Sequence, residues 1–142
     1  MTLDAARACH PGARTFRFGD GPALNAEILA LVRSGAKTES CDAAAAFARR
    51  GEPLPSPGRT DIALTGDGAP ACAIRTIAVD RMPFDAMTED RVAAQGEFRD
   101  LAHWRAGYTA YLRRAGLFAP DLEMVVETFE LVETFERMDD DA

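Results

Sequence analysis

The sequence has 142 residues and a mass of 15.3 kDa, the size of one domain with its own core. Hydrophobic residues make up 47% and charged residues 27%, as in ordinary globular proteins. No apolar run approaches the roughly 18 residues of a membrane helix, and the N-terminus lacks the apolar stretch of a signal peptide. We therefore expect a cytoplasmic protein without membrane contact.

The net charge of −7 is concentrated at the C-terminal end. Residues 121–142 hold nine acidic residues and one arginine, whereas residues 1–120 hold 14 acidic and 15 basic residues. The body is thus nearly neutral, which excludes a large basic nucleic-acid footprint and leaves room only for a small patch. Three cysteines without a CxxC pair and two histidines predict no disulfide framework, no metal site and no cofactor.

The pattern predicts a flexible tail over residues 1–14, one domain over residues 15–136 and an acidic tail over residues 137–142. Within the domain, periodicity and turn residues predict a strand, a helix, a strand, a short helix, a β-hairpin, two helices and a strand. The expected bounds, in that order, are Thr15–Phe18, Pro22 to the C-cap Gly35, Lys37–Cys41, Ala43–Arg50, Asp61–Leu64 paired with Ala71–Val79, Thr88–Gln95, Arg99–Arg114 and Glu123–Phe135.

Local signals support these bounds. Asp20 and Asp42 are expected to cap the first two helices, and Gly116 is expected to stop the long helix. Thr65-Gly66-Asp67-Gly68 is a strong turn signal between the two hairpin strands. Because strands and helices do not alternate regularly, we expect an α+β fold with a mixed sheet curled into a barrel, not a parallel doubly wound sheet.

The segment after the first helix is the first candidate site. Lys37 is the only lysine among 16 basic residues, and lysine differs from arginine because burial can make it a neutral base or nucleophile. In an extended segment Lys37, Glu39 and Cys41 point one way, and Thr38 and Ser40 the other. The alternative is an ion pair of Lys37 with Glu39 or Glu97 that fixes the helix–strand junction.

Other residues allow both a functional and a structural interpretation. Arg75 in an apolar strand is either a phosphate contact or an outward side chain. Trp104 can stack on a base, but its helical spacing is more typical of a core residue. Glu127 on the apolar face of the last strand must pair or face a cleft. We expect no functional role for His103, and Cys41 is expected to fill space in the core.

Several motifs, taken in order, resemble the ASCH-domain family, whose fold is similar to the PUA domain. The motifs are Phe16–Asp20, Gly35–Asp42, Gly66–Pro70, Ile74–Thr76, Gly96–Leu101, Trp104-Arg105 and Val126–Phe129. The resemblance covers about residues 15–133 and is strongest with the stand-alone bacterial branch. It implies a PUA-like mixed β-barrel with flanking helices and a cleft lined by the Gly-x-Lys segment.

Family members have been assigned RNA binding, ribonuclease activity and hydrolysis of the acyl amide of N4-acetylcytidine. In the amidohydrolases a Lys, a Thr three residues later and a Glu form the catalytic group. The resemblance places Lys37 and Ser40 at the first two positions and Glu97 near the third. Gln95 stands where the family usually has Glu, and Asp42 where it usually has Arg.

We therefore expect an RNA-directed hydrolase whose ligand is RNA or a modified nucleoside and not DNA. Lys37 would activate Ser40 or stabilise a developing negative charge, and Glu97 would supply the carboxylate. The alternatives are an amidohydrolase of N4-acylated cytidine and a non-catalytic RNA- or nucleotide-binding module. The residues expected to bind the ligand are Thr38, Glu39, Arg75, Gln95, Trp104 and Glu127.

Overall fold

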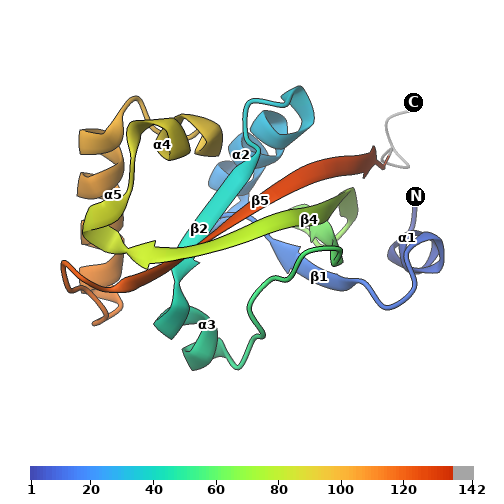
Figure 1. The fold of residues 1–142 in the computed structure, drawn as a ribbon. Coiled ribbons are helices and arrows are strands. Elements are labelled where there is room, and N and C mark those ends of the chain that lie inside the picture. The colour runs from blue at the N-terminus through green and yellow to red at the C-terminus, as the bar shows by residue number, and fades with distance from the viewer. Residues whose placement is uncertain (136–142) are drawn as a thin grey trace.

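The computed structural model describes residues 1–135, which form one curled five-stranded sheet with helices on both faces (Figure 1). The helices are α1 (Leu3–Cys9), α2 (Pro22–Ser34), α3 (Ala44–Arg50), the 3₁₀ turn η1 (Phe84–Ala86), α4 (Glu89–Gln95) and α5 (Leu101–Arg114). The strands are β1 (Arg14–Arg17), β2 (Glu39–Ala43), β3 (Thr60–Leu64), β4 (Pro70–Pro83) and β5 (Glu123–Thr134).

The strand order is β1-β3-β4-β5-β2. β1 pairs in parallel with β3, and every other pair is antiparallel. The predicted hairpin of β3 and β4 is present, closed by a hydrogen bond of 2.8 Å from Thr65 N to Ala69 O. The pairing of β4 with β5 shifts register between Thr76 and Ala78, and such bulges bend a sheet. The structure confirms an α+β fold with a curled mixed sheet.

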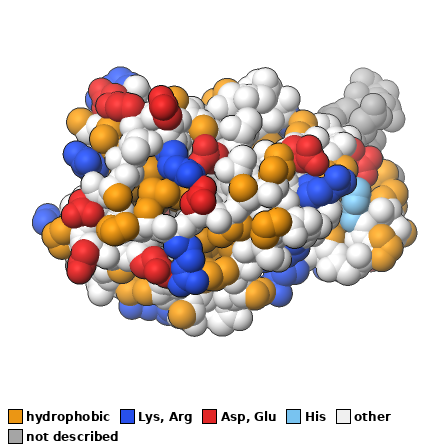
Figure 2. All heavy atoms as spheres, in the orientation of Figure 1, with side chains coloured by type: hydrophobic (Ala, Val, Ile, Leu, Met, Phe, Trp, Pro, Cys, Tyr) orange, Lys and Arg blue, Asp and Glu red, His pale blue; other side chains and the backbone are white. Residues whose placement is uncertain are grey.

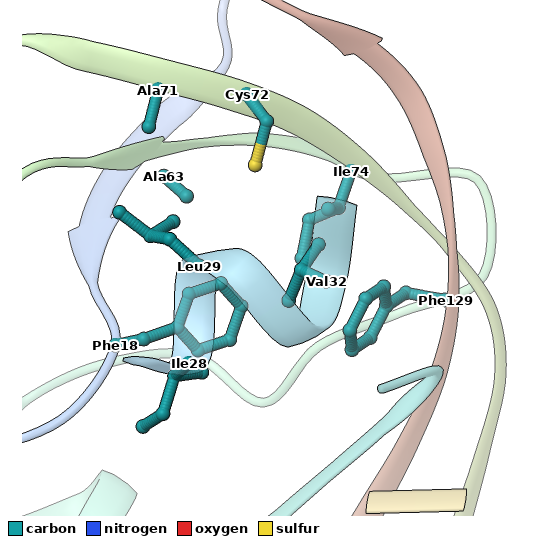
Figure 3. Close-up of a cluster of buried hydrophobic side chains, with 9 residues drawn as sticks. All are labelled: Phe18, Ile28, Leu29, Val32, Ala63, Ala71, Cys72, Ile74 and Phe129. Carbon is teal, nitrogen blue, oxygen red and sulfur yellow. The ribbon is translucent and has the colours of Figure 1, made fainter. Parts of the chain in front are cut away.

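Helix α2 lies in the curve of the sheet and packs against its concave face. Figure 3 shows Leu29 and Val32 of α2 among side chains from β3, β4 and β5, with Cys72 and Ile74 contributed by β4. Burial of these apolar side chains is the main force holding α2 to the sheet. The buried members of this cluster are Phe18, Ile28, Leu29, Val32, Ala63, Ala71, Cys72, Ile74 and Phe129.

Two further clusters cover the convex face. Helices α4 and α5 pack Val92, Trp104 and Leu112 against Met124 and Val126 of β5. Helix α1 packs at the other end of the sheet, where its Ala6 contacts a cluster of Ile62, Leu64, Ala73 and Phe135. Alternate residues of a strand face opposite sides, so β5 supplies both the concave and the convex core.

The structure differs from the sequence prediction at residues 1–14, because Leu3–Cys9 form helix α1. Thr2 caps this helix, Ala6 is fully buried, and His10 Nε2 lies 2.6 Å from Glu133 Oε1 of β5. A helix of seven residues is marginal by itself and depends on tertiary contacts, which periodicity does not reveal. The predicted acidic tail, residues 137–142, lies outside the described residues.

Both predicted aspartate caps are wrong. Gly21 is the N-cap of α2, and Ala43 is the N-cap of α3 because β2 runs directly into the helix. The carboxylate of Asp42 instead pairs with Arg50 at 3.1 Å. Strand β4 also continues past the predicted end to Pro83, since its pairing with β5 extends that far. No helix within residues 1–135 is long and apolar enough to cross a membrane.

Candidate functional site

Lys37 is buried between the end of α2 and the start of β2, with 3% of its surface exposed. Its Nζ donates to the backbone oxygens of Glu39 at 2.7 Å and Gln95 at 3.2 Å, and to Oε2 of Glu97 at 2.7 Å. These three acceptors match the three N–H donors of an ammonium group. The geometry therefore favours a charged Lys37 that ties β2 to the end of α4.

Two glycines allow this close approach. Gly35 ends α2 with a φ of 83°, and Gly96 ends α4 with a φ of 74°, a conformation that costs other residues energy. A Cβ at Gly96 would lie 2.7 Å from the carbonyl oxygen of Ala36, so only glycine lets the two segments touch. Thr38 N then donates to Ala94 O at 2.8 Å and continues the contact.

The structure does not join Lys37 to Ser40 as the predicted catalytic group requires. All the hydrogen-bond partners of Lys37 Nζ are other groups, and the buried Oγ of Ser40 has no partner within residues 1–135. A lysine that accepts the Ser40 proton must be neutral and adjacent. The contact that is present is the Lys37–Glu97 ion pair, the structural alternative drawn from the sequence.

A second set of polar side chains lies on the concave face of the sheet, beyond α2. Ser40 of β2 and Glu127 of β5 are cross-strand partners and share this face. Glu127 Oε2 accepts a hydrogen bond of 2.6 Å from Thr76 Oγ1. Asp61 of β3 is 4% exposed; its Oδ2 accepts from Arg59 Nε and a terminal nitrogen at 3.0 and 2.8 Å. We call these five residues the concave polar cluster.

Electrostatics link this cluster to Lys37. Burial raises the pKa of the Glu127 carboxyl, because desolvation disfavours its charged form. The hydrogen bond from Thr76 lowers that pKa, and the neighbouring charge of Asp61 raises it. The positive charges of Arg59 and Lys37 both lower it. Glu127 therefore lies within the electric field of both groups.

The raised pKa of Glu127 predicts a pH-dependent stability. The ordinary pKa of the carboxyl is 4.5, so just above pH 4.5 this carboxyl is deprotonated more often in the unfolded chain than in the folded chain. The stabilisation by the protonated form is complete below 4.5 and is lost as pH rises through the folded pKa. We expect the stability of Glu127→Gln relative to wild type to rise with pH above 4.5 and to level off once the pH exceeds the folded pKa, measured by urea denaturation at a series of pH values.

Glu130→Gln is the matched control for this prediction, because Glu130 is an exposed carboxylate on the same strand and pairs with Arg75. Its stability difference from wild type should vary less with pH. A Glu127→Gln difference that is constant over the range would contradict the raised pKa.

Glu39 and Thr38 do not join the concave polar cluster. Glu39 Oε1 pairs with Arg91 at 3.0 Å, and Arg91 also pairs with the exposed Asp80. Burial raises the pKa of Glu39, whereas the charge of Arg91 lowers it. Thr38 is exposed at the edge of the site.

Gln95 and Trp104 are core residues, which corrects the expectation that they bind a ligand. Both are 0% exposed. The Trp104 ring stacks on Phe84 and Tyr108 at centroid distances of 5.0 and 4.8 Å, and its Nε1 donates to Gln95 Oε1 at 3.0 Å. Arg75 is an outward side chain, the structural one of its two interpretations, since it faces solvent and pairs with Glu130.

Sequence reasoning missed three members of the concave polar cluster, Arg59, Asp61 and Thr76. Asp61 opens the apolar run that was assigned to a strand, and an acid there shares a face with Ala63 two residues on. That alternation was a usable signal. Thr76 carried none, because threonine is common in strands on either face. No three His, Cys, Asp or Glu side chains in the described part of the chain are grouped to hold a metal ion.

A family model described as the ASCH domain matches residues 14–133. The chain belongs to the ASCH-domain family. A crystal structure of protein EF3133 from Enterococcus faecalis V583 is similar, with 28% identity and a TM-score of 0.79 over 92% of this chain and 85% of that one. A comparison with curated proteins gives no match.

A second solved structure, an ASCH domain from Lactobacillus crispatus JV V101, has a TM-score of 0.75 with 23% identity. The match covers 95% of this chain and 87% of that one. It shows the shared fold, and the expectation of a PUA-like architecture is confirmed. The ASCH domain here thus combines a curled sheet, an ion pair of the buried Lys37 with the partly exposed Glu97, and a concave polar cluster.

Proposed function

We propose that this ASCH domain binds RNA or a modified nucleoside on the concave face of its sheet, at the polar cluster that lies within the electric field of Lys37. The observation that carries the proposal is the concave polar cluster, in which Ser40 Oγ and Asp61 Oδ1 are buried without a partner among the described residues. Buried polar groups are nearly always paired, so two unpaired ones on one face indicate a place for a ligand. The PUA-like fold is often linked to RNA binding.

The charge distribution favours a short or small ligand. On the face shown in Figure 2, basic and acidic side chains are interspersed. Several exposed arginines, among them Arg75 and Arg81, are paired with glutamates. A long strand of RNA needs a continuous basic path for its phosphates. The surface therefore supports a few phosphate contacts and a ligand held mainly by its base.

Titration of the purified protein with a five-nucleotide single-stranded RNA and with nucleosides tests the proposal. We expect binding with a shallow salt dependence, because about two phosphate contacts give a slope near −1.4 in log K against log salt. A matched DNA oligonucleotide should bind more weakly. Absence of binding to every RNA and nucleoside would refute the proposal, and a slope of about −2.8, the value for contacts to all four phosphates of the oligonucleotide, would refute a base-centred mode.

A hydrolase is the second candidate, and one observation favours it. Ser40, whose hydroxyl is buried, is the cross-strand partner of Glu127, and burial raises the pKa of the Glu127 carboxyl and so makes its carboxylate a stronger base. Glu127 would take the Ser40 proton as the oxygen attacks a carbonyl or phosphoryl centre and pass it to the leaving group. Water would then release the acyl or phosphoryl group. Glu97 is not available for this role while it binds Lys37.

Incubation with single-stranded RNA and with N4-acylated cytidines, read by mass spectrometry, tests the hydrolase. Shortened RNA would identify a ribonuclease, and free cytidine an amidohydrolase. Either product should disappear with Ser40→Ala and with Glu127→Gln. Product from wild type that persists in both variants would exclude this mechanism. If wild type forms no product, the hydrolase is refuted and the non-catalytic binding module is the remaining interpretation.

A further inference from the structure

The two unpaired atoms of the concave polar cluster differ in what they can bind. Asp61 is 96% buried, and Arg59 binds only its Oδ2, through two hydrogen bonds. Its Oδ1 is left as a free acceptor. An ionised carboxylate can only accept hydrogen bonds. The group that pairs with Asp61 Oδ1 must therefore be a donor.

The neighbours of Asp61 strengthen this requirement. Asp61 is close enough to Glu127 for its charge to raise the pKa of Glu127, and the hydrogen bond from Thr76 occupies only Oε2 of Glu127. Ser40 Oγ can accept or donate. Arg59 and Lys37 are the cations nearby, and both already have carboxylate partners. Asp61 Oδ1 thus offers a fixed acceptor to a ligand, in a cluster with a Ser40 hydroxyl that adapts to either role.

We infer that Ser40, Asp61 and Glu127 form a subsite for a nucleobase that carries an exocyclic amino group. The inference rests on the proposed function, which supplies the nucleobase. Cytosine, adenine and guanine present amino N–H donors, and carboxylates accept from such groups. Uracil carries a carbonyl oxygen where cytosine carries its amino group, and an oxygen that faces the carboxylate oxygen of Asp61 is unfavourable. The subsite therefore selects against uracil.

Arg59 ties Asp61 to the segment that precedes β3. The Arg59 guanidinium joins Asp61 to the backbone oxygen of Leu54, to which it donates at 3.3 Å. Ser40 Oγ and Asp61 Oδ1 are both enclosed in this conformation. A base therefore reaches these two atoms only after a local movement opens the enclosure.

The test measures the affinity of wild type for pentauridylate and for the same RNA with a central cytosine, adenine or guanine. We expect each amino base to bind about tenfold more tightly than uracil. Guanine should also bind more tightly than hypoxanthine, which lacks only the amino group. This comparison isolates the amino group from ring size and stacking.

Asp61→Asn gives the sharpest prediction. Arg59 needs an acceptor, so the amide oxygen of the new side chain turns to it and the amide nitrogen takes the position of Oδ1. The free acceptor becomes a donor without a change of size. We expect the preference for amino bases to disappear and the affinity for the uracil oligonucleotide to equal or exceed theirs.

Asp80→Asn is the matched control, because Asp80 is also an aspartate paired with an arginine, Arg91, but lies outside the cluster. It should keep the wild-type base preference. Ser40→Ala provides a second variant that leaves the Arg59–Asp61 pair intact, and it should reduce the preference in part. Thermal unfolding checks that each variant is folded.

The outcomes separate this inference from the proposed function. RNA binding without base preference, or a preference unchanged in folded Asp61→Asn, would overturn the amino-base subsite and leave RNA binding standing. A preference lost in Asp61→Asn and kept in Asp80→Asn would support the subsite. If wild type binds neither RNA nor nucleosides, both proposals fail together.

Discussion

Replacing Lys37 with methionine is expected to lower the free energy of unfolding by about 3–5 kcal/mol. The side chain is 3% exposed and its ammonium is the partner of Glu97 and of two backbone oxygens. Methionine keeps the apolar stem but leaves those acceptors without a donor. At about 2–4 °C per kcal/mol for a chain of this size, the melting temperature should fall by about 10 °C.

Two further variants test whether the loss of stability comes from the broken Lys37–Glu97 pair. Lys37→Met combined with Glu97→Gln removes the uncompensated carboxylate and should recover part of the lost stability. Arg81→Met is the matched control, because it breaks an ion pair with Glu123 whose side chains are about half exposed. It should cost less than about 1 kcal/mol. A Lys37→Met protein as stable as wild type would show that the pair does not hold the junction of β2 and α4.

Replacing Trp104 with alanine is expected to cost about 3–5 kcal/mol. Its ring is fully buried between Phe84 and Tyr108, and its Nε1 satisfies the side-chain oxygen of Gln95. The change leaves a cavity and removes a buried hydrogen bond at once. Chemical denaturation with urea measures this loss directly.

Trp104→Phe distinguishes a core residue from a base-stacking one. Phenylalanine keeps the stacking on Phe84 and Tyr108 but lacks the N–H donor, so it should cost about 1–3 kcal/mol. At a temperature where this variant is folded, its RNA affinity should equal that of wild type. Weaker RNA binding by a fully folded Trp104→Phe would place the ring at the ligand, contrary to its burial.

The Lys37 segment shows how far a candidate site can be predicted from local pattern. The single lysine after a glycine cap was visible in the sequence, and so was an ion pair with Glu97 as one alternative. Glu39, which is nearer in the chain, meets Lys37 through its backbone oxygen and sends its carboxylate to Arg91. Chain proximity therefore did not decide which carboxylate pairs with the lysine.

Glu127 and Trp104 show what a local sequence pattern can predict and what it cannot. The alternation of β5 correctly indicated that Glu127 must pair or face a cleft, because strand periodicity is a local property. The helical spacing of Trp104 was compatible with both a core and a stacking role. Only the packing of η1 and α5 around its ring, with Phe84 some twenty positions earlier in the chain, made it part of the core.

The sequence by itself determined the type and approximate bounds of most elements, the β3–β4 hairpin and the α+β class, since these follow from periodicity and turn chemistry within a few residues. The tertiary structure alone decided the parallel pairing of β1 with β3 and the meeting of Arg59 and Asp61 with Glu127. Such contacts join strands far apart in the chain. They depend on register and on the curl of the whole sheet, which no local pattern specifies.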